Sequence, residues 1–120
     1  MSNKTKARTF LQFAGMGKVR QGFDDFISEN FIHHNQYFEG DRKTILKAME
    51  EDHASNPNLS IEIKHCYEDG QFVITHSLVK KKDIDIVVVH IFRFEEDMIT
   101  EMWDLGQIID PLSPNKNGLF

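Results

Sequence analysis

The sequence is poor in the residues that stabilise small proteins covalently or through metals. Cys66 is the only cysteine among 120 residues, so the chain forms no internal disulfide and offers no cysteine cluster for a metal. No apolar run approaches the ~20 residues that a membrane-spanning helix needs. The polar first residues do not resemble a signal peptide. We therefore expect a cytoplasmic protein with no membrane partner.

Positive charge is also in deficit. Fourteen basic residues face nineteen acidic ones, which gives a net charge of −5. Such a surface repels phosphate backbones, so we expect no nucleic-acid partner. Tyrosine occurs twice and tryptophan once, but phenylalanine occurs ten times. Many rings without polar groups favour a thick core or an apolar pocket. The length is that of a single domain, residues 1–120.

The first half of the chain predicts helices. Apolar residues recur at helical spacing in residues 5–19 and again in residues 20–31, where Phe23, Phe26 and Ile27 form a stripe. A short extended segment follows at residues 31–35. Asp41 is a suitable N-cap for a helix that runs to residue 54, which Pro57 prevents from continuing.

The second half predicts strands joined by tight turns, followed by a loose tail from about residue 110. The expected strands cover residues 59–67, 71–81, 84–94 and 98–109. Helices first and antiparallel hairpins afterwards indicate the α+β class. We expect a cone-shaped, curved, mostly antiparallel sheet with the N-terminal helices packed on it, an α+β barrel around a cavity.

The hairpin at residues 90–107 carries most of the reactive side chains. Three strand faces carry these side chains: the first carries His76, the second His90 and Phe92, and the third Glu101, Trp103 and Gln107. If the three faces line one concavity, two imidazoles and a carboxylate meet in an apolar space. Such a group can move protons to and from carbon or oxygen. His76, His90 and Glu101 are therefore candidate catalytic residues.

Two other uses of these residues remain open. Arg93 on the adjoining strand is a rival partner for Glu101, in a structural ion pair. Alternatively, His34, His76, His90 and Glu101 could bind a metal, although no closely spaced pair holds two ligands on one element. We expect no metal and no cofactor. We expect His33 and His53 at the surface.

Two motifs resemble the SnoaL-like proteins of the nuclear-transport-factor-2-like superfamily. F-I-H-H-N at residues 31–35 resembles the family's Y-I-Q-H-N-P at Ile32, His34 and Asn35. The hairpin resembles its D-x-F-R-x-x-x-G-K-I-x-E-H-W-D at Phe92, Arg93, Ile99, Glu101, Trp103 and Asp104. The resemblance implies a cone-shaped α+β barrel with a ligand cavity, and a homodimer formed through the sheet. It also implies polyketide cyclisation, isomerisation, dehydration, or binding without reaction.

The sequence departs from that pattern near the expected site. His90 stands where the family often has aspartate. The resemblance to polyketide cyclases of this group implies an aspartate late in the last strand that acts as acid and base. Asp104 is the available carboxylate, but strand parity places it opposite Trp103, so it is a secondary catalytic candidate.

The leading hypothesis is a small protein that binds an apolar, oxygen-bearing molecule and catalyses cofactor-free proton transfer on it. The alternative is a non-catalytic ligand-binding or dimerisation module. The predicted catalytic residues are His76, His90, Glu101 and Asp104, and the predicted ligand-binding residues are His34, Asn35, Phe92, Trp103 and Gln107.

Overall fold

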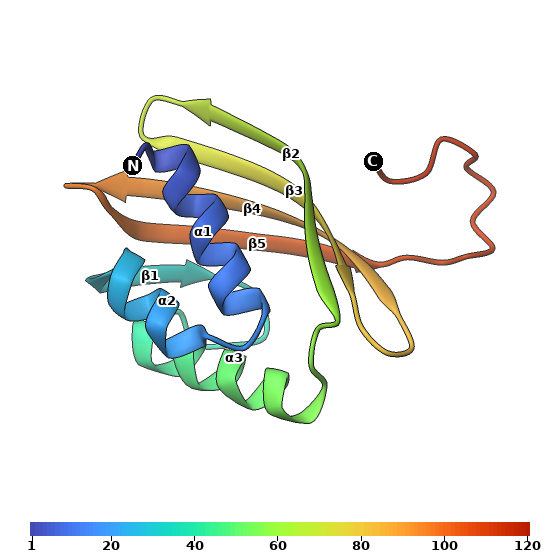
Figure 1. Ribbon diagram of the computed structural model, residues 1–120, viewed down its shortest axis with the longest axis horizontal. Helices are drawn as coiled ribbons and strands as arrows, with labels where there is room; N and C mark the ends of the chain where they lie inside the picture. Colours follow the sequence, from blue (N-terminus) through green and yellow to red (C-terminus); the bar gives the residue numbers. More distant parts are fainter.

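The computed structural model describes all 120 residues as an α+β fold of three helices and five strands (Figure 1). The elements in chain order are α1 (Asn3–Gly15), α2 (Val19–Phe26), β1 (Ile27–His34), α3 (Arg42–Ser55), β2 (Ser60–Asp69), β3 (Phe72–Lys80), β4 (Asp85–Glu95) and β5 (Met98–Ile108).

Side-chain caps explain where two of the helices begin. The Ser2 hydroxyl accepts a hydrogen bond from the Thr5 backbone N–H at 3.1 Å and caps α1. The Asp41 carboxylate accepts one from the Thr44 backbone N–H at 3.1 Å, which confirms the predicted N-cap of α3.

The predicted helix over residues 20–31 is wrong in its second half. The chain leaves the helix at Phe26 and becomes β1, a strand that pairs in parallel with β5. The alternation of buried Phe31 and His33 with exposed Ile32 and His34 is the period of a strand. Pairing with β5 therefore outweighs the helical spacing of Phe23, Phe26 and Ile27.

The sheet has the order β1-β5-β4-β3-β2, and all pairs except β1–β5 are antiparallel. The four strands of the second half thus form the predicted hairpins. The β4–β5 turn holds Glu96 and Asp97 at positive φ, 48° and 68°. This backbone shape matches the twist of the strands that it joins.

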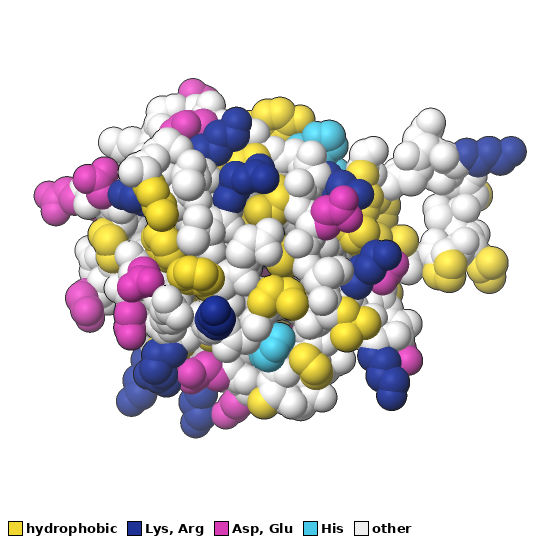
Figure 2. All heavy atoms as spheres, in the orientation of Figure 1, with side chains coloured by type: hydrophobic (Ala, Val, Ile, Leu, Met, Phe, Trp, Pro, Cys, Tyr) yellow, Lys and Arg dark blue, Asp and Glu magenta, His cyan; other side chains and the backbone are white.

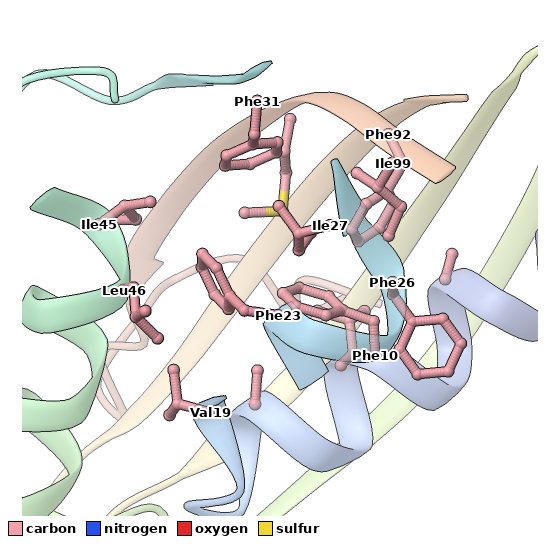
Figure 3. Packing of buried hydrophobic residues seen from close by; sticks show 14 of the residues in the cluster. Phe10, Val19, Phe23, Phe26, Ile27, Phe31, Ile45, Leu46, Phe92 and Ile99 are labelled. Carbon is pink, nitrogen blue, oxygen red and sulfur yellow. The ribbon is translucent and has the colours of Figure 1, made fainter. Parts of the chain in front are cut away.

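All three helices cover one face of the curved sheet, as predicted (Figure 1). The core between these layers is built on phenylalanine. Phe10, Phe23 and Phe92 are fully buried, and the Phe10 ring centroid lies 5.7 Å from that of Phe23 and 6.2 Å from that of Phe92. Figure 3 shows these rings directed into one cluster with aliphatic residues of α3 and β5. The many phenylalanines therefore form a thick core.

Charges of both signs intermingle on the face that carries the helices, with no extended basic patch (Figure 2). None of the helices is both long and apolar enough to cross a membrane.

Candidate functional site

The register of the strands decides which side chains face the helices. Val73, Phe92 and Met102 lie side by side on β3, β4 and β5, and all three are buried in the core. Side chains alternate between the two faces of a strand. Thr75, His90 and Asp104, two residues further along each strand, therefore form the next inward-facing row.

His90 and Asp104 of this row border a cavity of about 480 Å³ between the sheet, α1, α3 and the segment after β1. The volume falls in the usual range for small-molecule sites. Most of the lining is apolar and comes from Leu11, Ile45, Met49, Ile61, Val79, Ile86 and Val88. Asn35, His90 and Asp104 supply polar groups at one end of the cavity.

Two neighbours from β1 and the residue after it hold the Asp104 carboxylate. His33 Nε2 lies 2.9 Å from Asp104 Oδ2, and Asn35 Nδ2 donates to Asp104 Oδ1 at 2.9 Å. An ionised carboxylate only accepts hydrogen bonds, so the His33 nitrogen is the donor. The Asn35 amide is itself oriented, because its Oδ1 accepts a hydrogen bond from the Tyr37 backbone N–H. The carboxylate is therefore fixed while its side chain remains 27% exposed.

The surroundings of Asp104 keep it ionised. Burial by itself raises the pKa of this carboxyl, but the hydrogen bond from His33, the nearby imidazoles and the hydrogen bond from Asn35 outweigh burial. The net result is a pKa below the ordinary aspartate value. At neutral pH the cavity thus contains a fixed negative charge.

His90, the cross-strand neighbour of Asp104, is held neutral. Burial lowers the pKa of His90 to about 4, although the Asp104 carboxylate acts in the opposite direction. No protein group forms a hydrogen bond with the ring, and its Nδ1 is buried without a partner. A neutral imidazole carries one N–H donor and one acceptor. His90 therefore presents an unused polar ring beside a charged carboxylate.

The predicted convergence of His76, His90 and Glu101 is wrong. His90 faces the cavity, but His76 pairs with Val89 and Glu101 with Arg93 in rows that face away from the helices. Asp104 and Trp103 lie on opposite faces of β5, as predicted. The prediction is wrong about which faces of β3 and β5 point inward, because Asp104 borders the cavity and Glu101 lies on the outer face.

The predicted ligand-binding residues are also divided between the two faces. Asn35 borders the cavity, whereas Phe92 is buried in the core beneath it. Gln107 lies at the edge of the cavity, but it pairs with Val87 in an outward row and also lines a hollow on the outer face. His34 and Trp103 lie on the outer side of the sheet, where their rings stack with centroids 4.7 Å apart.

Two histidines that were expected at the surface lie inside. His33 is only 4% exposed, and His53 borders the cavity. In β1, His33 is two residues from Phe31, so the two side chains share a face. The burial of Phe31 places His33 inward, and this spacing is the signal that could have identified it.

The sequence profile of the SnoaL-like domain matches residues 7–102. The chain belongs to the SnoaL-like family. Its membership confirms the resemblance of the two motifs. A comparison with curated protein sequences finds no significant match.

Solved structures share the fold of this SnoaL-like chain at low sequence identity. A SnoaL-like polyketide cyclase from Agrobacterium tumefaciens is 13% identical with a TM-score of 0.72, over 89% of this chain and 92% of its own. A proposed ketosteroid isomerase from Kribbella flavida is 14% identical with a TM-score of 0.75, over 95% and 84%. A protein of unknown function from Burkholderia xenovorans, similar to nuclear transport factor 2, is 13% identical with a TM-score of 0.74, over 95% and 88%. These similarities show the cone-shaped α+β fold.

Glu101 of the SnoaL-like motif takes part in a network on the outer face. Arg93 Nε donates to Glu101 Oε1 at 2.9 Å, and the His34 ring also bonds to this carboxylate. The hydrogen bond from His34 is the largest cause, followed by that from Arg93, of a Glu101 pKa below the ordinary value. The predicted rival pairing of Glu101 with Arg93 is therefore present.

The SnoaL-like fold does not bring together the four alternative metal ligands, which are His34, His76, His90 and Glu101. His34 and Glu101 meet on the outer side of the sheet, whereas His90 faces the cavity. His76 stacks on His65 elsewhere on the outer face.

Proposed function

We propose that the cavity binds a small, largely apolar ketone or enone and that Asp104 moves a proton to and from the carbon beside its carbonyl group. The observation that carries this proposal is the ionised Asp104 carboxylate, held by His33 and Asn35 at the end of an apolar cavity. Two proteins of similar structure, a polyketide cyclase and a proposed ketosteroid isomerase, support this class of reaction.

Asp104 and His90 of the inward row have distinct roles in this reaction. The Asp104 carboxylate removes the proton, and the carbonyl oxygen gains negative charge as the enolate forms. His90, neutral at working pH, donates its N–H to that oxygen. The resulting carboxylic acid of Asp104 returns a proton to carbon, which completes an isomerisation. In a longer substrate the enolate could instead attack a second carbonyl carbon, as in aldol cyclisation.

The low pKa of Asp104 has two opposite effects on the rate. It keeps the carboxylate in the base form at neutral pH, but it makes that base weaker. The apolar cavity compensates in part, because a hydrogen bond to a developing oxyanion is stronger where water is excluded. His33 and Asn35 are positioning residues in this scheme, since they hold the carboxylate.

Solvent deuterium exchange tests the proposal. Cyclohexenone is incubated in deuterium oxide with the protein, and loss of its α-proton signals is followed by NMR. We expect catalysed exchange that falls by roughly 10²–10⁴-fold in Asp104→Asn, the usual contribution of a general base. Glu101→Gln is the matched control, because it removes a carboxylate three residues away on the outer face.

Two results would contradict the assignment. Equal loss of exchange in Glu101→Gln and Asp104→Asn would remove the distinction between the faces. Binding of the ketone without exchange in the wild-type protein would favour the non-catalytic binding module.

We also propose that the protein is a homodimer formed through the outer face of the sheet. The exposed apolar residues of that face support this arrangement; they are Tyr67, Phe72, Ile74 and Leu105.

A further inference from the structure

A second polar cluster borders the same cavity far from Asp104. It consists of Asp52 and His53 in the last turns of α3, Asn58 before β2, and Lys81 after β3. On β3, the residue beside His90 is Thr75, and Lys81 is six residues further along the chain. The cavity is therefore polar at both ends and apolar between them.

Lys81 is unusually buried for a lysine. Its side chain is only 8% exposed, and its ammonium donates to the Asn56 carbonyl at 2.6 Å and to Asp52 Oδ2 at 3.3 Å. An ammonium group has three N–H donors. One donor of Lys81 thus has no protein acceptor, although the side chain borders the cavity.

Two further groups of the cluster have unused hydrogen-bonding capacity. Asn58 Nδ2 donates to the Gly15 carbonyl at 2.7 Å, but Asn58 Oδ1 is buried without a donor. His53 Nδ1 is also buried without a partner. Buried polar side-chain atoms are nearly always paired in folded proteins. Unpaired atoms on two residues that border one cavity point to a polar group on the ligand.

The α1–α2 loop holds the His53 ring at the cavity. Gly17 has φ of 96°, and a Cβ atom at this position would lie 2.7 Å from His53 Nε2. Only glycine allows the loop to approach the ring this closely. The position of His53 is thus set by the loop packed against it.

The unused groups favour a hydroxyl over other oxygen groups. Lys81 supplies a donor, Asn58 Oδ1 is an acceptor, and His53 Nδ1 is one or the other. A hydroxyl both accepts and donates. A carboxylate would meet the Asp52 carboxylate and the Asn58 oxygen, and a ketone would leave Asn58 Oδ1 unpaired.

We propose that Lys81, Asn58 and His53 form a second binding subsite, which takes an alcoholic or phenolic hydroxyl at the end of an elongated ligand whose carbonyl group lies at Asp104. This inference rests on the proposed function for the placement of the carbonyl. It narrows the substrate class to rigid or extended apolar ketones with a hydroxyl remote from the carbonyl.

Isothermal titration with three tetracyclic enones tests the subsite. Testosterone carries a hydroxyl at the end remote from its enone, androstenedione carries a ketone there, and the deoxy analogue of testosterone carries only hydrogen. We expect testosterone to bind roughly tenfold more tightly than the deoxy analogue, with androstenedione between them. Asn58→Leu and Lys81→Met should each reduce this preference to less than about threefold. Lys80→Met, an exposed neighbour, should retain it.

Circular dichroism and thermal unfolding identify any variant that fails to fold, and the other variant then carries the test. Equal binding of testosterone and its deoxy analogue by the wild-type protein would overturn the subsite, as would an unchanged preference in both variants. Failure of all three enones to bind would overturn it too, because the subsite requires a cavity that holds an elongated ketone. Cyclohexenone exchange, measured separately on the wild-type protein, distinguishes this failure from failure of the proton-transfer proposal.

Discussion

Asp104 and His90 are neighbours on adjacent strands, yet they do not form an ion pair. Their surroundings lower both pKa values, so the carboxyl is ionised while the imidazole is neutral. Hydrogen bonds from His33 and Asn35 favour the charged form of Asp104, whereas nothing in the protein bonds to His90. One ionised carboxylate and one neutral donor are thus held side by side, which is the division of roles that enolisation requires.

The neutral state of His90 predicts a specific loss of stability in mild acid. In the unfolded chain this histidine binds a proton below its ordinary pKa of 6.5, but in the folded protein only below about 4. As pH falls from 6.5 to 4, protonation therefore favours unfolding. The pKa difference corresponds to about 3 kcal/mol. Urea unfolding should show this decrease in the wild-type protein and a smaller decrease in His90→Gln. Parallel pH profiles for the two proteins would contradict the prediction.

Part of the site can be predicted from the sequence. The apolar neighbours of His90 within β4 placed it inward, and the motif match named Asn35 and Asp104. The motif includes His34 but not His33, so it does not indicate that His33 lies at the site. The two-residue spacing from Phe31 predicts an inward His33, but only if residues 27–34 form a strand rather than the end of a helix.

The strands show why alternation alone could not select the inner face. On β3, the outward residues Phe72, Ile74 and Leu78 are more apolar than the inward residues Thr75 and Ser77. Hydrophobicity therefore pointed to the wrong side. In β2, a register shift between Ile63 and His65 also interrupts the alternation. The hairpins and the helix layer depend on local patterns and are predicted. The choice of face depends on what covers the sheet.

No local sequence pattern predicts the contacts of the C-terminal segment. After β5 the chain loops outward and returns towards the sheet (Figure 1). The Phe120 ring stacks on His76 with centroids 4.9 Å apart, and Lys64 Nζ lies 5.7 Å from the same ring centroid. Leu119 borders a hollow on the outer face with His76 and Leu105. The end of the chain thus covers part of an apolar surface.

Removal of the Phe120 ring should be visible at His76. In Phe120→Ala, we expect the ring-proton NMR signals of His76 to shift downfield, because the stacked aromatic ring no longer shields them. The free energy of unfolding should change by less than about 1 kcal/mol, since Phe120 is itself 41% exposed. Leu112→Ala, at a position 87% exposed, is the control and should leave the His76 signals unchanged. Identical spectra for both variants and the wild-type protein would show that the tail does not occupy this face.

At the scale of the whole molecule, the sheet is covered by helices on one side and left largely bare on the other (Figure 1). Ile91 and Trp103 are half-buried on the bare side, and Leu105 is 65% exposed. Contiguous apolar surface of this kind marks an interaction site. The continuous apolar run of β4 has the pattern of a strand that is covered on both faces. A second copy of the chain, packed sheet against sheet, would supply the missing cover.

The proposed dimer predicts that a charge at the centre of the bare face separates the subunits. A twofold interface brings each residue near its own counterpart or a neighbour, so Ile74→Lys introduces two like charges into an apolar contact. Multi-angle light scattering should give twice the 14.0 kDa chain mass for the wild-type protein and the single mass for the variant. Lys80→Glu, at the end of the same strand, tests whether any charge change there has this effect and should remain dimeric. Because the cavity lies on the opposite face, monomeric Ile74→Lys should still catalyse exchange of the cyclohexenone protons. A wild-type protein that is monomeric at all concentrations would refute the proposed dimer.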